Sequence, residues 1–469
     1  MIFQKCINKY LRIAFIPLII IHIIVLENIR FTLWPEMVVY PYLINNGFSL
    51  YKDLINPYPP TLILLLSALT NIVGYQPQIF QLFTWILIII TDIILYQVLL
   101  KIFKTHYLSL FSLIIFMIIS ISFGINGLWF DLVQTPFIIL SLYYFIKFKE
   151  EKSIGNLNLS LILVITAIFI KQQAVWIVLA YIVILFFYNR KNAFQLLFKL
   201  YPALIFFIVL SIELIFCFYK TNTLFEFINW ALYFPFIKAS KISGYLSLPT
   251  IKQLLPIIVI LILSSPSIFY SRTKRFYLLP IMLSLLFFAY PRFDYFHLIP
   301  ALAFISILIG LSINIILKAS LAERLTYFLL MIMIFIYVAR FITRNISTEI
   351  RFFEPEIQIA ANFISITTNK NEPLYILNGP DQIFPLSSRL PIKPWADEFP
   401  WYLENGNLQQ NIVLSLISKN PRFIVSKPYS EGDKFDLGSY RPQVIADYLD
   451  NNYQNYYQIT KTLWLKKKV

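Results

Sequence analysis

The sequence contains few cysteines and few charged residues for a protein of its length. Its 469 residues include only two cysteines, which excludes a disulfide scaffold and a cysteine-based metal site. Charged residues make up 13% of the chain, whereas soluble domains carry about 25%. A glycine-rich phosphate-binding loop is also missing, so nothing in the sequence supports nucleotide binding. Together these absences exclude an ordinary soluble enzyme.

The chain has long apolar runs instead. Hydrophobic residues make up 58% of it, and a helix needs roughly 20 mostly apolar residues to cross a bilayer. Two neighbouring runs are separated by Lys171, Gln172 and Gln173, where we expect a turn because a lysine at the bilayer centre is costly. We predict about eleven transmembrane helices, in the ranges 11–29, 79–100, 107–124, 130–147, 157–171, 174–188, 200–218, 251–270, 276–290, 298–317 and 325–342.

The formal net charge of +15 belongs almost entirely to the apolar part of the chain. Residues 1–343 hold 25 Lys and Arg against 11 Asp and Glu, whereas residues 344–469 hold 14 against 13. The short loops on one side of the predicted helices carry 16 basic residues, and the longer loops on the other side carry eight. By the positive-inside rule, the N-terminus lies in the cytoplasm and residues 344–469 lie outside. The charge therefore indicates orientation in the membrane and not binding of nucleic acid.

Residues 344–469 alternate helix and strand signals, which predicts a small α/β soluble domain. We expect helices from Pro355 onward and over 408–419 and 441–452, and strands over 373–377, 422–426 and 456–465. The irregular, aromatic segment 387–402 is expected either to cover an active site or contact an acceptor, or to pack as a surface loop. The predicted fold class is thus a polytopic α-helical membrane protein with a C-terminal α/β soluble domain.

Acidic and basic side chains recur in the segments that this topology places outside. The first outer loop, 30–78, contains Glu36 and Asp53. Its apolar stretch 61–74 is too short to span and suits a helix at the interface. The remaining outer charges are Asp131 at the start of a span, Lys171 in the turn, and Arg292, Asp294 and His297 in the segment YPRFDYFH.

Two interpretations of these outer residues stay open. Taken singly, each is explained as a solvated loop charge, and Arg292 and Asp294 as a pair of little net energy. Taken together, they can line one cavity, in which carboxylates act as a general base or hold a divalent cation and the cations hold a phosphate. Two acids inside spans, Asp92 and Glu213, are interpreted as helix–helix hydrogen-bonding groups.

The order of these elements resembles that of the GT-C glycosyltransferases, among them the protein O-mannosyltransferases and the lipid A aminoarabinose transferases. The resemblance covers essentially the whole chain, including the Lys171 turn, Asp131 and the YPRFDYFH segment. One residue departs from the family pattern, because Pro35 stands where an Asp-Glu pair would have its Asp. The first loop carries the residues that match: Glu36 and Tyr40, then Gly47, Tyr51 and Asp53, then Pro57, Pro59, Pro60 and finally Gly74.

The resemblance implies a membrane glycosyltransferase that takes a sugar from a polyprenyl-phosphate donor and gives it to a hydroxyl of a glycan, lipid or protein. Glu36 or Asp53 would act as the catalytic base. Lys171, Arg292 and His297 would bind the donor phosphate. The resemblance fixes no cofactor; some relatives use a divalent cation, and Glu36, Asp53 or Asp131 could hold one here. The supporting residues are Tyr40, Tyr58, Asp131 and Asp294.

Three other functions remain open on the sequence. A transporter or flippase for lipid-linked sugars would use the same carrier, but such proteins often contain matched internal repeats, and the sequence has none. An O-antigen-type glycan polymerase or ligase usually places its cations in a large late loop, whereas the long loop here is the first. A non-catalytic relative is consistent with Pro35.

Overall fold

The structure is a computed structural model, which describes residues 14–188, 196, 198–270 and 272–469. Some residues counted in the composition and charge arguments lie outside the described ones: one cysteine, Cys6, and the basic residues Lys5, Lys9, Arg12, Arg190 and Lys191. The chain divides into two units. The helical unit consists of Met1–Phe31, Leu82–Ile212 and Ser247–Thr348, and the mixed unit consists of Thr32–Gln81, Glu213–Leu246 and Glu349–Val469.

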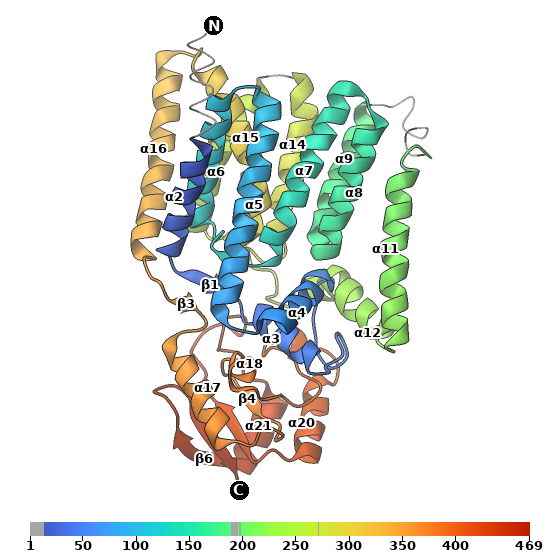
Figure 1. Ribbon diagram of the computed structural model, residues 1–469, viewed down its shortest axis with the longest axis vertical. Helices are drawn as coiled ribbons and strands as arrows, with labels where there is room; N and C mark the ends of the chain where they lie inside the picture. Colours follow the sequence, from blue (N-terminus) through green and yellow to red (C-terminus); the bar gives the residue numbers. More distant parts are fainter. Residues whose placement is uncertain (1–13, 189–195, 197, 271) are drawn as a thin grey trace. The chain divides into compact units, whose positions relative to one another are not determined.

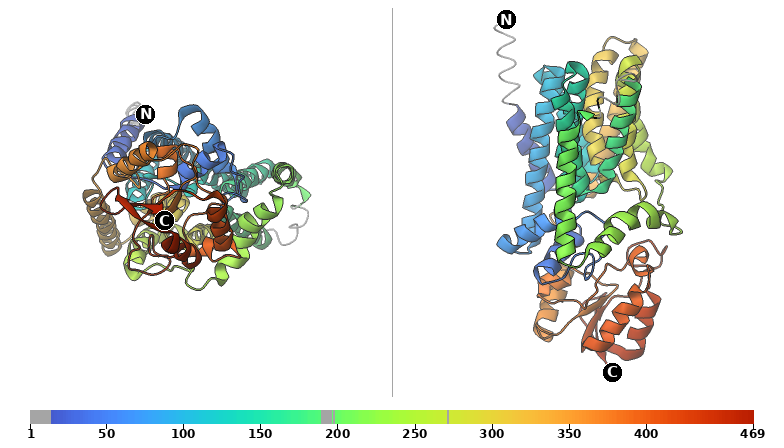
Figure 2. Two further views of the ribbon diagram at one scale, coloured as in Figure 1. Left: turned by 90° about the horizontal axis from the view of Figure 1, so that it is seen from below. Right: turned by 90° about the vertical axis from the view of Figure 1, so that its right-hand side faces the viewer.

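The predicted spans are helices in the structure. Within the described residues each of the eleven ranges contains one, and most run side by side as a bundle (Figure 1; Figure 2, right). Among the described residues, five helical segments are long and apolar enough to cross a membrane, and five further predicted spans contain shorter apolar helices. The remaining one, Phe130–Glu151, has 22 residues and falls in neither group. The bundle helices are α2 Phe15–Glu27, α5 Pro77–Phe103, α6 His106–Ser122, α7 Phe130–Glu151, α8 Ile154–Ile170, α9 Val175–Tyr188, α11 Tyr201–Lys220, α13 Ile251–Phe269, α14 Arg272–Leu286, α15 Ile299–Ile316 and α16 Leu321–Arg344.

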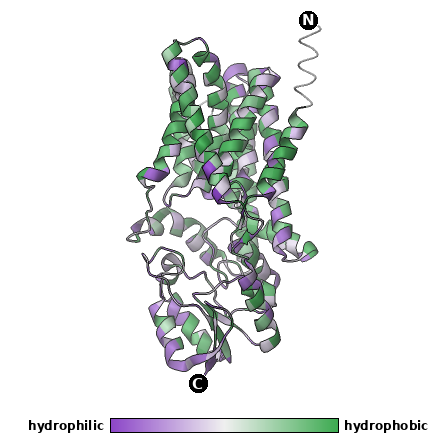
Figure 3. Ribbon diagram, turned by 90° about the vertical axis from the view of Figure 1, so that its left-hand side faces the viewer, coloured by the Kyte–Doolittle hydropathy of each residue, from purple (hydrophilic) through white to green (hydrophobic). Residues whose placement is uncertain are grey.

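Apolar residues predominate along the helices of this unit (Figure 3), and its buried apolar side chains form one core. Helix α15 is central, because it packs against α6, α7 and α13. At Gly310 it approaches α6 so closely that an added Cβ would lie 1.9 Å from Ser112 Oγ. Small residues permit such close approach between membrane helices.

The two intramembrane acids have different surroundings. Asp92 on α5 contacts His22 on α2, with 2.8 Å between Asp92 Oδ2 and His22 Nδ1, and both residues are buried. This pair confirms the helix–helix interpretation for Asp92. Glu213 is exposed on α11, so the same interpretation is wrong for Glu213.

The first loop of the mixed unit folds into two helices, α3 Glu36–Asn45 and α4 Thr61–Val73, which pack against each other. Helix α4 covers the predicted interfacial stretch. It ends at Gly74, whose φ of +84° suits glycine and whose N–H donates to Thr70 O at 2.9 Å. A second segment of this unit contains the short helix α12 Leu224–Phe227 and the π-helix η2 Ile228–Lys238.

The C-terminal part of the mixed unit is the predicted α/β domain. Its sheet has the order β4-β5-β7-β6, with β4 parallel to β5 and the other pairs antiparallel. Three helices begin or end within a few residues of the predicted bounds, namely α17 Pro355–Thr367, α20 Leu408–Lys419 and α21 Gln443–Asn452. Two short helices, α18 Ile383–Ser387 and α19 Pro400–Leu403, complete it. The strands are β4 Tyr375–Leu377, β5 Phe423–Ser426, β6 Tyr453–Gln458 and β7 Trp464–Lys468.

One predicted strand is wrong. Residues 456–465 do not form a single strand, because the chain reverses between β6 and β7, which pair antiparallel. Thr460 makes the reversal: its Oγ1 accepts from Leu463 N at 3.1 Å, and Ile459 N donates to Leu463 O at 2.9 Å. A threonine hydroxyl that binds a nearby backbone N–H favours a turn over a strand.

Candidate active site

In the helical unit, Asp131, Lys171 and His297 form one group, named here the Asp131 cluster. Asp131 is in the first turn of α7, Lys171 follows the last residue of α8, and His297 lies in the 3-10 turn η5 Tyr295–Leu298 before α15. Asp131 Oδ2 accepts from Lys171 Nζ at 2.5 Å and lies 2.9 Å from His297 Nδ1. The structure thus brings together three of the residues that the sequence analysis placed on the outer side.

Burial distinguishes the Asp131 cluster from ordinary loop charges. The side chains of Asp131 and Lys171 are 1% and 0% exposed, and that of His297 is 12% exposed. Gln134 Nε2 also donates to Asp131 Oδ1 at 3.1 Å, and the carboxylate lies in the first turn of α7, where a helix favours negative charge. The interpretation of Asp131 and Lys171 as solvated charges is therefore wrong.

The turn at Lys171 has the predicted form. Helix α8 ends at Ile170, the extended residue Lys171 follows, and the 3-10 turn η1 Gln172–Ala174 leads into α9. The extended backbone points the lysine side chain into the protein and not toward lipid, since the residue is fully buried. Its ammonium is therefore bound to Asp131 in this structure.

Arg292 and Asp294 lie in the segment that leads to η5. Arg292 forms a β-bridge with Ser247, and Phe293 N donates to Ser247 O at 3.0 Å. Asp294 is the N-cap of η5, with its Oδ1 accepting from Tyr295 N at 2.6 Å. Asp294 thus fixes the turn that carries His297.

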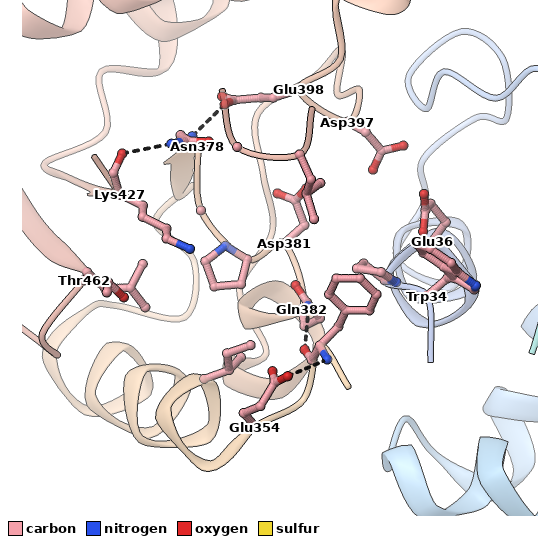
Figure 4. A pocket seen from close by; sticks show the side chains of 18 of the residues that line it. Trp34, Glu36, Glu354, Asn378, Asp381, Gln382, Asp397, Glu398, Lys427 and Thr462 are labelled. Atoms are coloured by element: carbon pink, nitrogen blue, oxygen red, sulfur yellow. Dashed lines mark hydrogen bonds between the residues drawn. The ribbon is translucent and has the colours of Figure 1, made fainter. Parts of the chain in front are cut away.

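In the mixed unit, Glu36 is the first residue of α3 and lines a cavity of about 390 Å³ (Figure 4). Among the described residues, none donates a hydrogen bond to its buried Oε2. Burial raises the pKa of Glu36 above the usual range, and the neighbouring Asp397 raises it further. A buried carboxyl with a free oxygen facing a cavity has the form of a general base before substrate binds.

Five more acidic residues line the same cavity, namely Glu354, Glu356, Asp381, Asp397 and Glu398, and the last three have raised pKa values. Burial raises the pKa of Asp381, and that of Asp397 as well, although the Tyr40 hydroxyl opposes the rise at Asp397. Burial raises the pKa of Glu398 to about 8, against the hydrogen bond that Asn378 N donates to its Oε2 at 2.6 Å. Several acids thus share a site in which they cannot all be ionised at neutral pH.

Asp53, the other predicted base, has partners. Its Oδ2 accepts from Lys393 Nζ at 2.9 Å and from Ser49 N at 3.0 Å. Gly47 O accepts from the same ammonium at 2.6 Å, and Tyr51 hydroxyl donates to Tyr58 O at 2.8 Å. The first-loop residues Gly47, Tyr51 and Asp53 therefore fix the backbone and hold Lys393. Asp53 remains a predicted base only through its second oxygen.

A metal site finds no support in the geometry. Within the ranges 14–188, 196, 198–270 and 272–469, no group of three or more His, Cys, Asp or Glu could hold a metal ion. The acids that line the cavity therefore do not form a site for a divalent cation.

Sequence reasoning missed Asp381, Asp397 and Glu398. A signal for two of them was present, because Asp397 and Glu398 form the only adjacent Asp-Glu pair in the sequence. They lie in the segment 387–402, which the sequence marked only as irregular and aromatic. Of the predicted residues, the structure brings Asp131, Lys171 and His297 together in one unit, and Glu36 and Tyr40 onto α3 in the other.

Comparison with known proteins gives a fold and no close relative. No protein-family model and no curated protein sequence matches the chain. The structure is similar to that of ArnT from Cupriavidus metallidurans, at 9% identity and a TM-score of 0.62 over 97% of each chain. The same enzyme bound to undecaprenyl phosphate gives 10% identity, a TM-score of 0.60 and the same coverage.

A second similar structure is the Archaeoglobus fulgidus oligosaccharyltransferase tethered to an acceptor peptide. It is 11% identical, with a TM-score of 0.56, over 97% of this chain and 74% of that one. Identities this low establish the arrangement of the chain and not its reaction. The protein is a multi-pass membrane protein with the fold of the GT-C glycosyltransferases.

Proposed function

We propose that the protein transfers a sugar from a polyprenyl-phosphate donor to an acceptor hydroxyl. The observation that carries the proposal is Glu36, a buried carboxyl with an unpartnered oxygen at a cavity, on the first loop of a GT-C fold. The bound undecaprenyl phosphate of ArnT and the acceptor peptide of the oligosaccharyltransferase support the two substrate classes.

In this reaction Glu36 Oε2 takes the proton of the acceptor hydroxyl as the oxygen attacks the anomeric carbon. A new carbon–oxygen bond forms there, and the bond from that carbon to the phosphate oxygen breaks. The lipid phosphate leaves with the bonding electron pair and gains negative charge. Because burial and Asp397 raise the pKa of Glu36, its carboxylate is a stronger base than an exposed glutamate.

As a separate assignment, we propose that the cations of the helical unit bind the phosphate group of a donor. His297 and Arg292 are its direct partners, since both side chains are partly exposed. Lys171 is fully buried next to His297 and contributes positive charge without direct contact with the phosphate. Asp131 holds both Lys171 and His297 in place. Cationic side chains that are held in place bind a phosphate through charge-assisted hydrogen bonds.

We also propose the orientation indicated by the basic loops. The N-terminus lies in the cytoplasm, and the loop 30–78 and residues 344–469 lie outside. The donor then enters from the outer leaflet, and the acceptor is a glycan, lipid or protein of the cell envelope.

The test is transfer from a panel of radiolabelled polyprenyl-phosphate sugars to hydroxyl-bearing lipids, glycans and peptides by the purified protein in nanodiscs. Glu36→Gln is expected to lower the rate by a factor of about 10² or more. Glu431→Gln is the matched control, because Glu431 is exposed and does not line the cavity. The proposal is wrong if the wild type uses no donor, or if Glu36→Gln is as active as Glu431→Gln.

A further inference from the structure

Within the mixed unit, a short segment of the C-terminal part, residues 393–398, is hydrogen-bonded to the first loop. Lys393 Nζ donates to Gly47 O and Asp53 Oδ2. Trp395 N donates to Asp53 O at 2.7 Å, and Ile55 N donates to Trp395 O at 3.1 Å. Both the segment and the first loop contribute backbone and side-chain groups to these bonds, so the segment is held against the loop at several points.

The fastened segment places Asp397 beside helix α3. Trp395 packs edge-on against Tyr40, with 5.9 Å between ring centroids, and is buried. Two residues later, Asp397 is only 6% exposed, and its Oδ2 accepts a hydrogen bond from the Tyr40 hydroxyl. Figure 4 shows the Asp397 carboxyl beside that of Glu36.

The first loop itself offers no second acid at this place. The residue before Glu36 is Pro35, which caps α3 and has no carboxyl. Tyr40 lies four residues after Glu36, so the two side chains share one face of α3. Asp397 is thus the second carboxyl beside Glu36. It lies 357 positions after Tyr40 in the sequence.

We infer that Asp397 is a positioning residue for the Glu36 carboxyl and acts together with Tyr40, in the transfer reaction proposed above, on which this inference rests. Its negative charge strengthens the affinity of Glu36 for the proton of the acceptor hydroxyl. When that proton moves to Glu36, two adjacent negative charges become one, and this relief favours the transfer. Tyr40 favours the ionised form of Asp397, because its hydroxyl donates to the carboxylate.

Other ionisable groups surround the pair and bear on its titration. The cavity brings Asp381 and Glu398 from the C-terminal part, Glu354 and Glu356 from the start of α17, and Lys427 after β5. Of these, Glu398 is the nearest in sequence to Asp397, but its carboxyl is bound by Asn378 N and Tyr375 hydroxyl. Glu398 is therefore a control, because it is a second buried carboxyl of the same cavity whose oxygens have partners of their own.

The test is a pH titration of the infrared band of the protonated Glu36 carboxyl, obtained as the difference between each protein and its Glu36→Gln form. Asp397→Asn is expected to lower the midpoint by about one pH unit or more, because it removes the neighbouring negative charge. Glu398→Gln is expected to leave the midpoint unchanged, and Asp397→Glu is expected to keep most of the wild-type shift. An unchanged midpoint in Asp397→Asn overturns the inference.

A second readout is the acid limb of the pH–rate profile, which is expected to move in the same direction as the midpoint. The infrared titration needs no turnover, so absence of transfer defeats the proposed function and leaves the Asp397 result standing. Should Asp397→Asn fail to fold, Tyr40→Phe takes its place. Tyr40→Phe retains both carboxyls but removes the hydrogen bond that favours the ionised form of Asp397, so it too is expected to lower the Glu36 midpoint. An unchanged midpoint in Tyr40→Phe overturns the inference.

Discussion

Asp53 and Lys393 are 340 positions apart in the sequence and form an ion pair of 2.9 Å within the mixed unit. The lysine side chain is 45% exposed and that of Asp53 is 20% exposed. Such a pair contributes only about 0–1 kcal/mol to the free energy of unfolding. Its importance is geometric, because it helps to hold residues 393–398 on the first loop.

The first prediction separates a structural from a catalytic role of Asp53. Asp53→Asn and Lys393→Met are each expected to lower kcat/KM by a factor of less than about 10, because each loosens the same segment. The double variant should be no worse than the stronger single variant, since both remove one interaction. A double-mutant cycle on the transfer rate measures this. If Asp53→Asn abolishes transfer while Lys393→Met does not, Asp53 is the base.

The second prediction concerns the buried pair of Asp131 and Lys171. Asp131→Asn leaves the Lys171 ammonium buried without its carboxylate, which costs about 3–5 kcal/mol of stability. Lys171→Met leaves the Asp131 carboxylate with only His297 and Gln134 as partners and is expected to cost less. The double variant Asp131→Asn/Lys171→Met is expected to be more stable than either single variant. Thermal unfolding in detergent measures the differences. Asp447→Asn is the control, because Asp447 pairs with Arg441 on the surface and its loss should cost about 0–1 kcal/mol.

The third prediction tests the close approach of α15 and α6. Gly310→Ala introduces a Cβ into the space of Ser112 Oγ and Phe103, which should cost about 1–3 kcal/mol. Adding Ser112→Ala removes the nearest atom and is expected to restore part of the loss. Equal melting temperatures for Gly310→Ala and wild type would mean that the two helices separate easily.

The fourth prediction follows from the raised pKa of Glu398. The folded state keeps a proton on Glu398 up to about pH 8, whereas an unfolded chain loses it near its ordinary value of 4.5. Its stabilising contribution is therefore complete below that ordinary value and is lost as the pH rises toward about 8. Glu398→Gln removes this loss, so its melting temperature should fall less than that of wild type between about pH 5 and about pH 8.

The control for this fourth experiment is Glu431→Gln, which changes an exposed carboxyl. It should reproduce the wild-type dependence of melting temperature on pH. A slope for Glu398→Gln that is as steep as that of wild type contradicts the assigned protonation of Glu398. Part of the slope is expected to remain in Glu398→Gln, since the pKa values of Glu36 and Asp381 are raised as well.

The membrane helices were predictable because hydropathy is a local property of the chain. A run such as 79–100 identifies its helix without information about any neighbour, and α5 begins and ends within three residues of it. Pro355 marks the start of α17 in the same way, because proline suits the first turn of a helix. The hairpin of β6 and β7 was missed, since the turn depends on the side chain of Thr460 and on pairing across it.

The candidate site was predictable only in part, for a related reason. Asp131, Lys171 and His297 follow from topology, because the ends of spans on one side of a membrane lie at one level. The partners of each could not be predicted, nor could the burial of Lys171. Asp397 depends on contacts across more than 300 residues, and no local pattern records such contacts.

The fastening of residues 393–398 to the first loop limits how this protein can diverge. A gene that exchanged only its C-terminal third with that of a distant homologue would receive a Glu36 helix from one parent and its companion acid from another. Tyr40, Asp53, Lys393 and Asp397 form one inherited set, so a change at one of these positions should be followed by compensating changes at the others. Recombination between the two regions is therefore expected to yield inactive proteins, although each region comes from an active parent.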